Sequence, residues 1–267
     1  MSHDRTPDVH GLLVLAVDLV RRAGELVRDG REGAASQVGA KSSPTDVVTA
    51  MDRASEALVV EGLRAARPAD GVLGEEGGER GGTGGVRWLL DPIDGTVNYL
   101  YGIPLYAVSL AAEVDGVVQV GVVRNPVTGE EWTAVRGEGA WRDGCRLAGS
   151  AVAELASALV GTGFGYRAEQ RAEQATVAAA LLPRVRDIRR LGAASLDLCY
   201  AADGRLDAYY EQGLHPWDLA AGGLIAEEAG LRVTGLGGRP AGAEMTLAAP
   251  PALHPVLHAE LTALIPR

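Results

Sequence analysis

The segment WLLDPIDGTVNYLYG, residues 88–102, constrains this chain more than any other part of its sequence. Residues 88–90 form an apolar run typical of a strand, and the run ends in two aspartates three positions apart. A tight turn explains Asp94 and Gly95, because Asp-Gly is a common turn dipeptide. It does not explain Asp91, since a structural strand normally ends without a second carboxylate. The reason for Asp91 has to be sought elsewhere in the chain.

Further acidic residues fall at the expected ends of other elements: Asp46 and Asp52 near the start of a helix, Glu75 and Glu76 after a strand, and Asp218 at the start of a helix. Each alone has an ordinary interpretation, as a solvated side chain, an exposed turn or a partner of a helix dipole. Together, carboxylates that converge at sheet edges repel one another unless cations lie between them. Oxygen ligands without Cys or His favour a hard ion such as Mg²⁺.

Gly95 and Thr96 add an anion-binding function to the opening segment. A helix that starts there points free backbone N–H groups at an anion, and glycine lets the anion approach closely. Magnesium also holds phosphates, and two ions about 3.5–4 Å apart can bind both the attacking and the leaving oxygen of an in-line displacement. The segment therefore predicts metal ligands and phosphate donors side by side.

Composition limits the class of protein. The 267 residues carry a formal net charge of −10, which argues against a nucleic-acid binder, because phosphate backbones are held by clustered Lys and Arg. The same charge would repel a phosphate substrate unless bound cations offset it. A hydrophobic content of 47% supplies the core of one large domain or of two closely packed lobes.

The two cysteines, Cys145 and Cys199, lie far apart without a CxxC motif or a His at ligand spacing. We therefore expect no disulfide framework and no zinc site, and a cytoplasmic location. The apolar stretch from Gly11 to Val20 is interrupted by Asp18 and continues as an amphipathic segment, so we expect neither a signal peptide nor a membrane span.

Apolar periodicity predicts mixed α and β layers packed as one unit. Helices are expected at about residues 8–30, 49–67, 168–182 and 216–229, with another from about residue 193. Strands are expected at about 71–73, 86–90, 131–141, 158–161, 185–189 and 206–210, and around a hairpin turn at Asp115-Gly116, with another turn at Asp143-Gly144. The glycine-rich residues 77–85 are expected to be a flexible connector.

Five motifs occur together in one known family: KSSPTDVVTAMD (41–52), GEE (74–76), DPIDGTVNYLYGIPLYAVSLA (91–111), RLGAASLDLCYAADGRLDAYYE (190–211) and HPWDLAAGGLIAEEAG (215–230). They resemble the inositol monophosphatases of the lithium-sensitive, Mg²⁺-dependent phosphatase superfamily, and the resemblance covers roughly residues 10–265. WLLDPIDGT combined with the distant PWDLAAG is highly specific, whereas GEE alone would be weak.

The resemblance implies an α+β fold, a layered αβαβα sandwich with an N-terminal antiparallel sheet lobe and a C-terminal mixed-sheet lobe. It implies a single domain over residues 1–267, with sub-lobes at about 8–150 and 151–265. A homodimer, inhibition by lithium and an active site where the layers meet are also expected from it.

The resemblance further implies a set of metal ligands. Glu75, Asp91 and the backbone carbonyl of Ile93 look like ligands of a first Mg²⁺. Asp91, Asp94 and Asp218 look like ligands of a second ion, and Glu75 would also touch a loosely held third.

The other site residues that the resemblance implies act on water, phosphate and alcohol. Thr96 and Asp52 look like the pair that, with Glu75, orients and deprotonates the attacking water, while Gly95 and Thr96 match phosphate-binding amides. Glu211, the Ala194 amide and Asp94 match contacts to the inositol part of the substrate. A carboxylate suits a polyol, because it accepts hydrogen bonds from two hydroxyls at once. The chain departs from the family at Ala193, where members commonly carry Thr or Ser.

Three interpretations concern residues outside this set. Lys41 is expected near the site as a further cation or on the surface. His215 is expected to pack against neighbouring residues or to support a residue of the site, because it has no nucleophile as a partner. The arginines of residues 184–190 are expected to form a solvated or dimer-facing strand.

The function implied is Mg²⁺-dependent hydrolysis of inositol monophosphate, a small-molecule phosphate ester, with no membrane or direct nucleic-acid partner. One alternative is the same chemistry on histidinol phosphate, fructose 1,6-bisphosphate or 3'-phosphoadenosine 5'-phosphate. Another is a binding role toward the transcription machinery on the same fold, as in some bacterial relatives.

Overall fold

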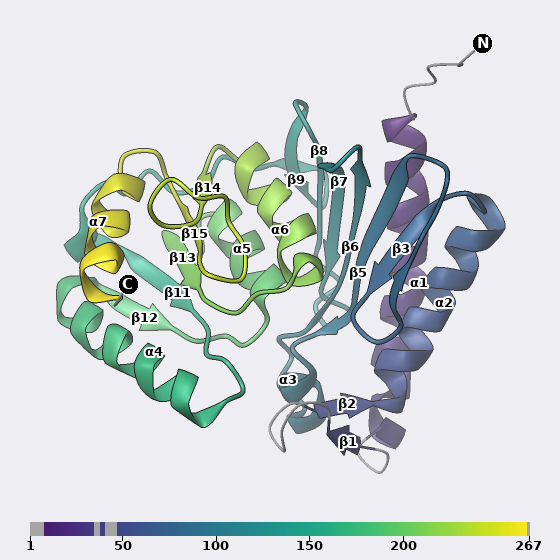
Figure 1. Ribbon diagram of the computed structural model, residues 1–267, viewed down its shortest axis with the longest axis horizontal. Helices are drawn as coiled ribbons and strands as arrows, with labels where there is room; N and C mark the ends of the chain where they lie inside the picture. The colour runs from purple at the N-terminus through teal and green to yellow at the C-terminus, as the bar shows by residue number, and fades with distance from the viewer. Residues whose placement is uncertain (1–7, 35–37, 41–46, 266–267) are drawn as a thin grey trace.

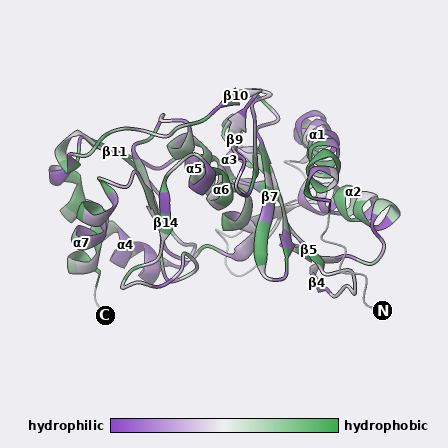
Figure 2. Cartoon of the chain, turned by 90° about the horizontal axis from the view of Figure 1, so that it is seen from above, coloured by the Kyte–Doolittle hydropathy of each residue, from purple (hydrophilic) through white to green (hydrophobic). Residues whose placement is uncertain are grey.

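The computed structural model describes residues 8–34, 38–40 and 47–265, which form five layers (Figure 1). Helices α1 (Val9–Ala34) and α2 (Ala50–Ala66) cover one face of an eight-stranded sheet. The other face packs against α5 (Ala194–Ala202) and α6 (Pro216–Glu228). These two helices lie between the first sheet and a second, five-stranded sheet (Figure 2). The outermost layer is formed by α4 (Ala168–Leu181) and α7 (His254–Leu264), so the expected αβαβα order is confirmed.

The first sheet is antiparallel except where β3 runs parallel to β5. Its strands, in spatial order, are β10 (Cys145–Arg146), β9 (Gly139–Arg142), β8 (Glu131–Val135), β7 (Val117–Arg124), β6 (Ala107–Val114), β5 (Val86–Asp94), β3 (Gly71–Gly74) and β4 (Gly78–Arg80). The expected hairpin joins β6 to β7, with Asp115 and Gly116 at φ values of 50° and 81°. Two positive φ angles in a two-residue turn match the right-handed twist of the strands.

The second sheet is mixed, as expected. Strand β11 is parallel to both β12 and β13, whereas β15 is antiparallel to β13 and β14. Its strands, in spatial order, are β12 (Asp187–Arg189), β11 (Leu159–Thr162), β13 (Ala208–Glu211), β15 (Thr246–Ala249) and β14 (Arg232–Thr234). The remaining elements are β1 (Val38–Ala40), β2 (Val47–Thr49), α3 (Thr96–Tyr101) and the 3-10 turns η1 (Leu155–Ser157) and η2 (Leu182–Arg184).

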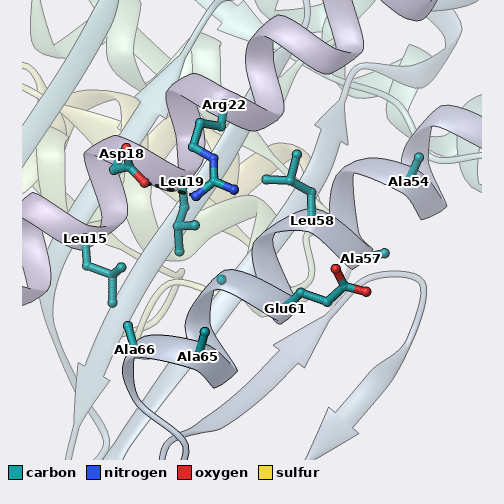
Figure 3. A pocket seen from close by; sticks show the side chains of 11 residues that line it. Leu15, Asp18, Leu19, Arg22, Ala54, Ala57, Leu58, Glu61, Ala65 and Ala66 are labelled. Atoms are coloured by element: carbon teal, nitrogen blue, oxygen red, sulfur yellow. Dashed lines mark hydrogen bonds and ion pairs between the residues drawn. The ribbon is translucent and has the colours of Figure 1, made fainter.

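Helices α1 and α2 each bury one stripe. Leu12, Ala16 and Leu19 recur at helical spacing on α1 and are fully or almost fully buried. On their outer side the two helices leave a groove lined by Leu, Ala and Gly, together with Asp18, Arg22 and Glu61 (Figure 3). This groove shares no lining residue with the carboxylate cavity described below.

Two expectations about local structure were wrong. Residues 78–80 are not part of a connector, because they form β4 and pair with β3 at the sheet edge. The surrounding glycines favoured a loop in the sequence, because glycine is depleted in strands. Glycine is nevertheless tolerated in a strand at an exposed sheet edge. The expected strand through 131–141 is split into β8 and β9 by a turn in which Gly137 adopts a φ of 82°.

Across residues 8–34, 38–40 and 47–265, no helix has both the length and the apolar character needed to cross a membrane.

Candidate active site

The site begins where β5 departs from regular pairing. Asp91 pairs with Ser109 and Asp94 pairs with Ala107, so the strand carries an extra residue between them. Such a bulge bends the strand and changes the direction of its side chains, and it tolerates Pro92, which lacks an N–H. The Ile93 amide donates to Asp91 Oδ1 at 3.0 Å, which stabilises the turn. The bulge explains how two carboxylates of one strand reach one site.

Gly95 links the strand to helix α3. Its φ of 89° lies in the left-handed region, and an added Cβ would lie 3.0 Å from the Leu105 carbonyl oxygen. Glycine is therefore required both by conformation and by space. The next residue, Thr96, starts α3 as expected.

Thr96 connects the segment to helix α2. Its Oγ1 lies 3.2 Å from Asp52 Oδ1 and 3.1 Å from the Ile93 carbonyl oxygen. Asp52 is fully buried in the first turn of α2, where Oδ2 accepts from the Thr49 amide at 2.7 Å. The expected contact between Thr96 and Asp52 is present, and Asp52 is held by the cap of its own helix.

Asp94 connects strand β5 to helix α5. Its Oδ1 accepts from the Ala194 amide at 3.1 Å, and its Oδ2 accepts from the Ser195 amide at 2.7 Å and the Ser195 hydroxyl at 2.5 Å. This carboxylate therefore caps the N-terminus of α5. The Ala194 amide, expected to contact the substrate, donates to Asp94 here.

Asp218 lies in the first turn of α6. Its Oδ2 accepts from the His215 amide at 2.7 Å, and Pro216 occupies the first helical position, where no N–H is needed. The His215 ring stacks on Trp217 with 4.8 Å between centroids, but His215 is exposed and lines the cavity, so its expected role stays a prediction.

These elements line a cavity of about 380 Å³. Of the sequence-predicted site residues, Glu75, Asp91, Ile93, Asp94, Gly95, Thr96, Ala194, Glu211 and Asp218 line it. Asp52 does not line the cavity but lies behind Thr96. Lys41 and Asp46 fall outside the residues that the structure describes. Of the GEE motif, Glu75 reaches the cavity, while the Glu76 amide donates to Glu56 at 2.9 Å.

The cavity concentrates negative charge. Burial raises the pKa of Asp91 well above its usual range, and the charges of Glu75 and Asp94 raise it further. Burial also raises the pKa of Asp218, with Asp94 as the next cause. The pKa of Asp94 is raised by burial, although hydrogen bonds from Ser195 oppose the rise. Carboxylates in this arrangement need protons or cations to coexist.

The donor set fits a hard cation. The candidate ligands are carboxylate oxygens and the Ile93 carbonyl, which are ligand types of Mg²⁺. His215 also lines the cavity, but its ring stacks on Trp217. Over the described part of the chain, no three His, Cys, Asp or Glu side chains are already arranged around a metal position. Asp94 and Asp218 instead accept hydrogen bonds from backbone amides. Binding an ion would therefore require carboxylates that already line the cavity to turn toward it.

Glu211 lies on the C-terminal side of the cavity, at the end of β13. The fully buried Tyr209 donates a hydrogen bond from its hydroxyl to Glu211 Oε2 at 2.5 Å. Burial raises the pKa of Glu211 to about 7, opposed by the Tyr209 hydrogen bond and by the charge of Arg190. Protein surrounds this carboxyl group on most sides, but part of its surface stays open to the cavity.

Several residues that line the cavity were not assigned to the site from the sequence. Arg190 lines the cavity while remaining exposed, and Arg184, Arg186 and Arg189 are exposed as well, so the solvated position expected for these arginines is confirmed. Gly163 and Trp217 also line it. A signal for Gly163 was present in the glycine-rich run GTGFG at 161–165, because clustered glycines at a strand end often mark close approach of other groups.

Comparison with known proteins gives a consistent result. The model of the inositol monophosphatase family matches residues 8–266. An inositol-1-monophosphatase of Mycobacterium leprae is 47% identical over 252 residues, covering 90% of this chain and 87% of the relative. The Nus factor SuhB of Salmonella typhimurium is 39% identical over 224 residues, covering 83% and 84%.

Solved structures agree with this result. The structure of Mycobacterium tuberculosis SuhB superposes with a TM-score of 0.81 at 41% identity, covering 96% of this chain and 97% of that one. The chain therefore belongs to the inositol monophosphatase family, whose members are metal-dependent phosphatases, and it is itself a phosphatase.

Proposed function

We propose that this protein hydrolyses inositol monophosphate to inositol and phosphate in a Mg²⁺-dependent reaction. The observation that carries the proposal is the cavity itself, which places Glu75, Asp91, Asp94 and Asp218 beside Gly95 and Thr96, with Glu211 on the opposite lobe. A relative that is 47% identical bears the name inositol-1-monophosphatase. The site therefore has a metal-binding side, a phosphate-binding corner and a side for the alcohol.

Two groups of ligands would hold the ions. Glu75, Asp91 and the Ile93 carbonyl would hold one Mg²⁺, and Asp91, Asp94 and Asp218 a second, while Glu75 would also reach a third. When bound, Mg²⁺ neutralises the charge of the phosphoryl group and makes a water acidic enough to attack at neutral pH. The repulsion that raises the pKa of Asp91 supports this assignment, because bound cations would relieve it.

Proton transfer from the attacking water would run through Thr96 and Asp52. The Thr96 hydroxyl can accept a proton as it passes its own to Asp52 Oδ1, which lies 3.2 Å away. Glu75 would orient the same water. Thr49 holds Asp52 in place, so the acceptor does not move during the transfer.

Gly95 and Thr96 would bind the phosphate through their backbone amides. Gly95 has no side chain to block an anion, and the N-terminal end of α3 favours negative charge. No covalent bond to the protein is needed, because positioned water can attack the phosphorus directly.

Glu211, Ala194 and Asp94 would contact the inositol ring. An ionised carboxylate accepts hydrogen bonds from two hydroxyls at once, which suits a polyol. The Ala194 amide donates to Asp94 in this structure, so it would have to exchange that partner for a substrate oxygen.

Further properties follow from the same proposal. We expect a homodimer, inhibition by lithium through the second-metal position, and a reducing, cytoplasmic setting. In support of the last, Cys145 and Cys199 are both free thiols, with Cys199 buried.

The comparisons do not favour histidinol phosphate, fructose 1,6-bisphosphate or 3'-phosphoadenosine 5'-phosphate as the substrate. A panel of these esters with inositol 1-phosphate, compared by kcat/KM in Mg²⁺, tests the choice. Inositol 1-phosphate should rank first, and a higher kcat/KM for another ester would refute the substrate assignment.

A second role in binding the transcription machinery is supported by relatives with the name Nus factor SuhB. Asp218→Asn separates the two functions, because the amide oxygen can still accept from the His215 amide while the ligand charge is lost. Turnover should disappear with unchanged thermal stability, whereas binding to a protein partner should persist.

A further inference from the structure

Gly163 lies directly against the carboxyl group of Glu211. It follows β11, and a Cβ built on it would overlap the carboxyl carbon and both carboxylate oxygens of Glu211. The φ angle of Gly163 is outside the left-handed region, so its backbone is open to alanine. This glycine is therefore required by the space that Glu211 occupies and not by its own conformation.

Tyr209 fixes the same carboxyl group from the other side. Tyr209 and Glu211 are two positions apart on β13, so their side chains point to the same face of the sheet. The tyrosine side chain is fully buried, and its hydroxyl donates to Glu211 Oε2 at 2.5 Å. A donor held in a packed core cannot follow the carboxyl group if that group moves.

Together, the two contacts hold the Glu211 carboxyl group in one orientation. Tyr209 binds one carboxylate oxygen, and Gly163 supplies the space beside it. The guanidinium charge of Arg190, which lines the same cavity, favours the ionised form of Glu211. An ionised carboxylate in a fixed orientation discriminates between alcohols by geometry, because each lone pair must meet a hydroxyl of the leaving group.

We propose that Gly163 and Tyr209 are positioning residues that set leaving-group specificity by holding Glu211 against the alcohol part of the substrate. This inference rests on the proposed function. The substrate class it specifies is the phosphate monoester of a polyol with neighbouring hydroxyls. Esters without hydroxyls gain nothing from the arrangement and depend on the metal and phosphate side of the cavity.

Gly163→Ala is a sharp test, because the atom it displaces is the end of a flexible side chain. The fold should accommodate the change by rotating Glu211, so stability is retained while the carboxylate leaves its position. Gly165→Ala is the matched control. It lies on the same loop, but its added Cβ would meet the side-chain amide of Gln170 and not Glu211.

The experiment compares wild type, Gly163→Ala, Tyr209→Phe and Gly165→Ala on inositol 1-phosphate and on p-nitrophenyl phosphate, both with Mg²⁺. For inositol 1-phosphate, Gly163→Ala and Tyr209→Phe should each raise KM by about tenfold or more, the range expected for a misplaced charged hydrogen-bond partner. The KM for p-nitrophenyl phosphate and the inhibition constant of inorganic phosphate should change by less than about twofold. Gly165→Ala should keep the wild-type ratio of kcat/KM between the two substrates.

A double-mutant cycle checks that both residues act through Glu211. When Glu211 is already replaced by Ala, adding Gly163→Ala or Tyr209→Phe should have no further effect on the KM for inositol 1-phosphate. Equal losses on both substrates, or additive losses in that background, would overturn the inference. Because Tyr209→Phe inserts no atom, it carries the test even if Gly163→Ala does not fold.

Failure of the proposed function would look different. Wild-type protein would then release no phosphate from inositol 1-phosphate, or would prefer an ester without hydroxyls. Turnover of inositol 1-phosphate by wild type with unchanged selectivity in both variants would refute the role of Gly163 and Tyr209 alone.

Discussion

Thr96 has one hydroxyl proton and two acceptors within reach. Its Oγ1 is 3.2 Å from Asp52 Oδ1 and 3.1 Å from the Ile93 carbonyl oxygen, and it can donate to one of them at a time. Donation to Asp52 leaves a lone pair for a proton that arrives from water. In the proposed mechanism the residue therefore acts at the reacting water through its hydroxyl and does not depend on its methyl group.

Thr96→Ala should lower kcat by about 10²–10⁴-fold, the usual contribution of a positioned proton-transfer group. KM should change little, because the backbone amide stays in place. Thr96→Ser keeps the hydroxyl and should retain most of the activity. Steady-state kinetics on inositol 1-phosphate measures both, and equal losses in the alanine and serine variants would count against the proton-transfer role.

At this scale the sequence predicted which acidic residues gather around one cavity, because a shared site can be recognised from residue type. It could not show that Asp94 accepts hydrogen bonds from Ala194 and Ser195, since those contacts depend on how two lobes pack. Gly163 was missed for the same reason. Its partner Glu211 is distant in sequence and becomes its neighbour only through the parallel pairing of β11 and β13.

Helix α3 is tied to both lobes through one side chain. Asn98 Nδ2 donates to the Leu105 carbonyl at 2.7 Å and to the Leu191 carbonyl at 2.8 Å. One contact lies just before β6, and the other lies on the loop that leads into α5. Asn98 therefore sets the position of the cavity wall relative to Gly95 and Thr96.

Asn98→Ala should destabilise the protein by about 1–3 kcal/mol, the cost of leaving buried polar groups without a partner. Denaturant unfolding measures the change. Tyr101→Ala on the same helix is the control, because that side chain is 81% exposed and should have a small effect. A loss in the control as large as that in Asn98→Ala would show that the contacts to both carbonyls are not the cause.

Helix α7 begins at a buried histidine. His254 Nε2 lies 2.9 Å from Thr234 Oγ1 on β14, and burial lowers the pKa of His254 to about 4, with Arg232 and His258 contributing. The folded state therefore binds fewer protons than the unfolded state between about pH 4 and pH 6.5. The unfolding free energy should accordingly fall as the pH drops through this window and be unaffected by His254 above it.

His254→Gln removes the titrating group and keeps a polar partner for Thr234. Its unfolding free energy should depend less on pH than that of wild type between pH 6.5 and pH 4, by at most a few kcal/mol, since one pKa unit is worth about 1.4 kcal/mol. Urea unfolding at several pH values measures the difference. Parallel curves for the two proteins would contradict a lowered pKa at His254.

Element by element, most helices and strands up to residue 229 were expected from the sequence, because their apolar periodicity is strong. The C-terminal elements β14, β15 and α7 were not anticipated. Two of them are strands of three and four residues in a region rich in glycine and proline, too short for alternation to show. Strand β15 is defined by pairing with β13, and β14 by pairing with β15, and both pairings are tertiary contacts.

The packing of the layers brings the cavity carboxylates together. Helix α6 carries Asp218 and packs on the first sheet, which carries Asp91 and Asp94. Gly121 on β7 permits the close approach, because an added Cβ would lie 2.8 Å from the Ala221 carbonyl oxygen. If these aspartates bind shared ions as proposed, the distance between the sheet and α6 decides whether they can do so.

Gly121→Ala should push α6 away from the sheet and destabilise the fold by about 1–3 kcal/mol, as overpacking of a core usually does. It should also weaken Mg²⁺ binding, because Asp218 moves with its helix. Denaturant unfolding and the Mg²⁺ dependence of activity measure the two effects. Gly81→Ala, where an added Cβ meets open space, should leave both unchanged. If the Gly121→Ala protein is destabilised but its activity depends on Mg²⁺ as in wild type, the position of α6 does not control metal binding.

The central claim is that the carboxylate cavity hydrolyses inositol monophosphate with bound Mg²⁺. The direct measurement is phosphate release from inositol 1-phosphate by the purified protein in Mg²⁺, in excess EDTA, and after Mg²⁺ is restored. We expect release in Mg²⁺, loss of release in EDTA and recovery when Mg²⁺ returns. Folded protein that releases no phosphate in Mg²⁺, or that releases it equally well in EDTA, would contradict the claim.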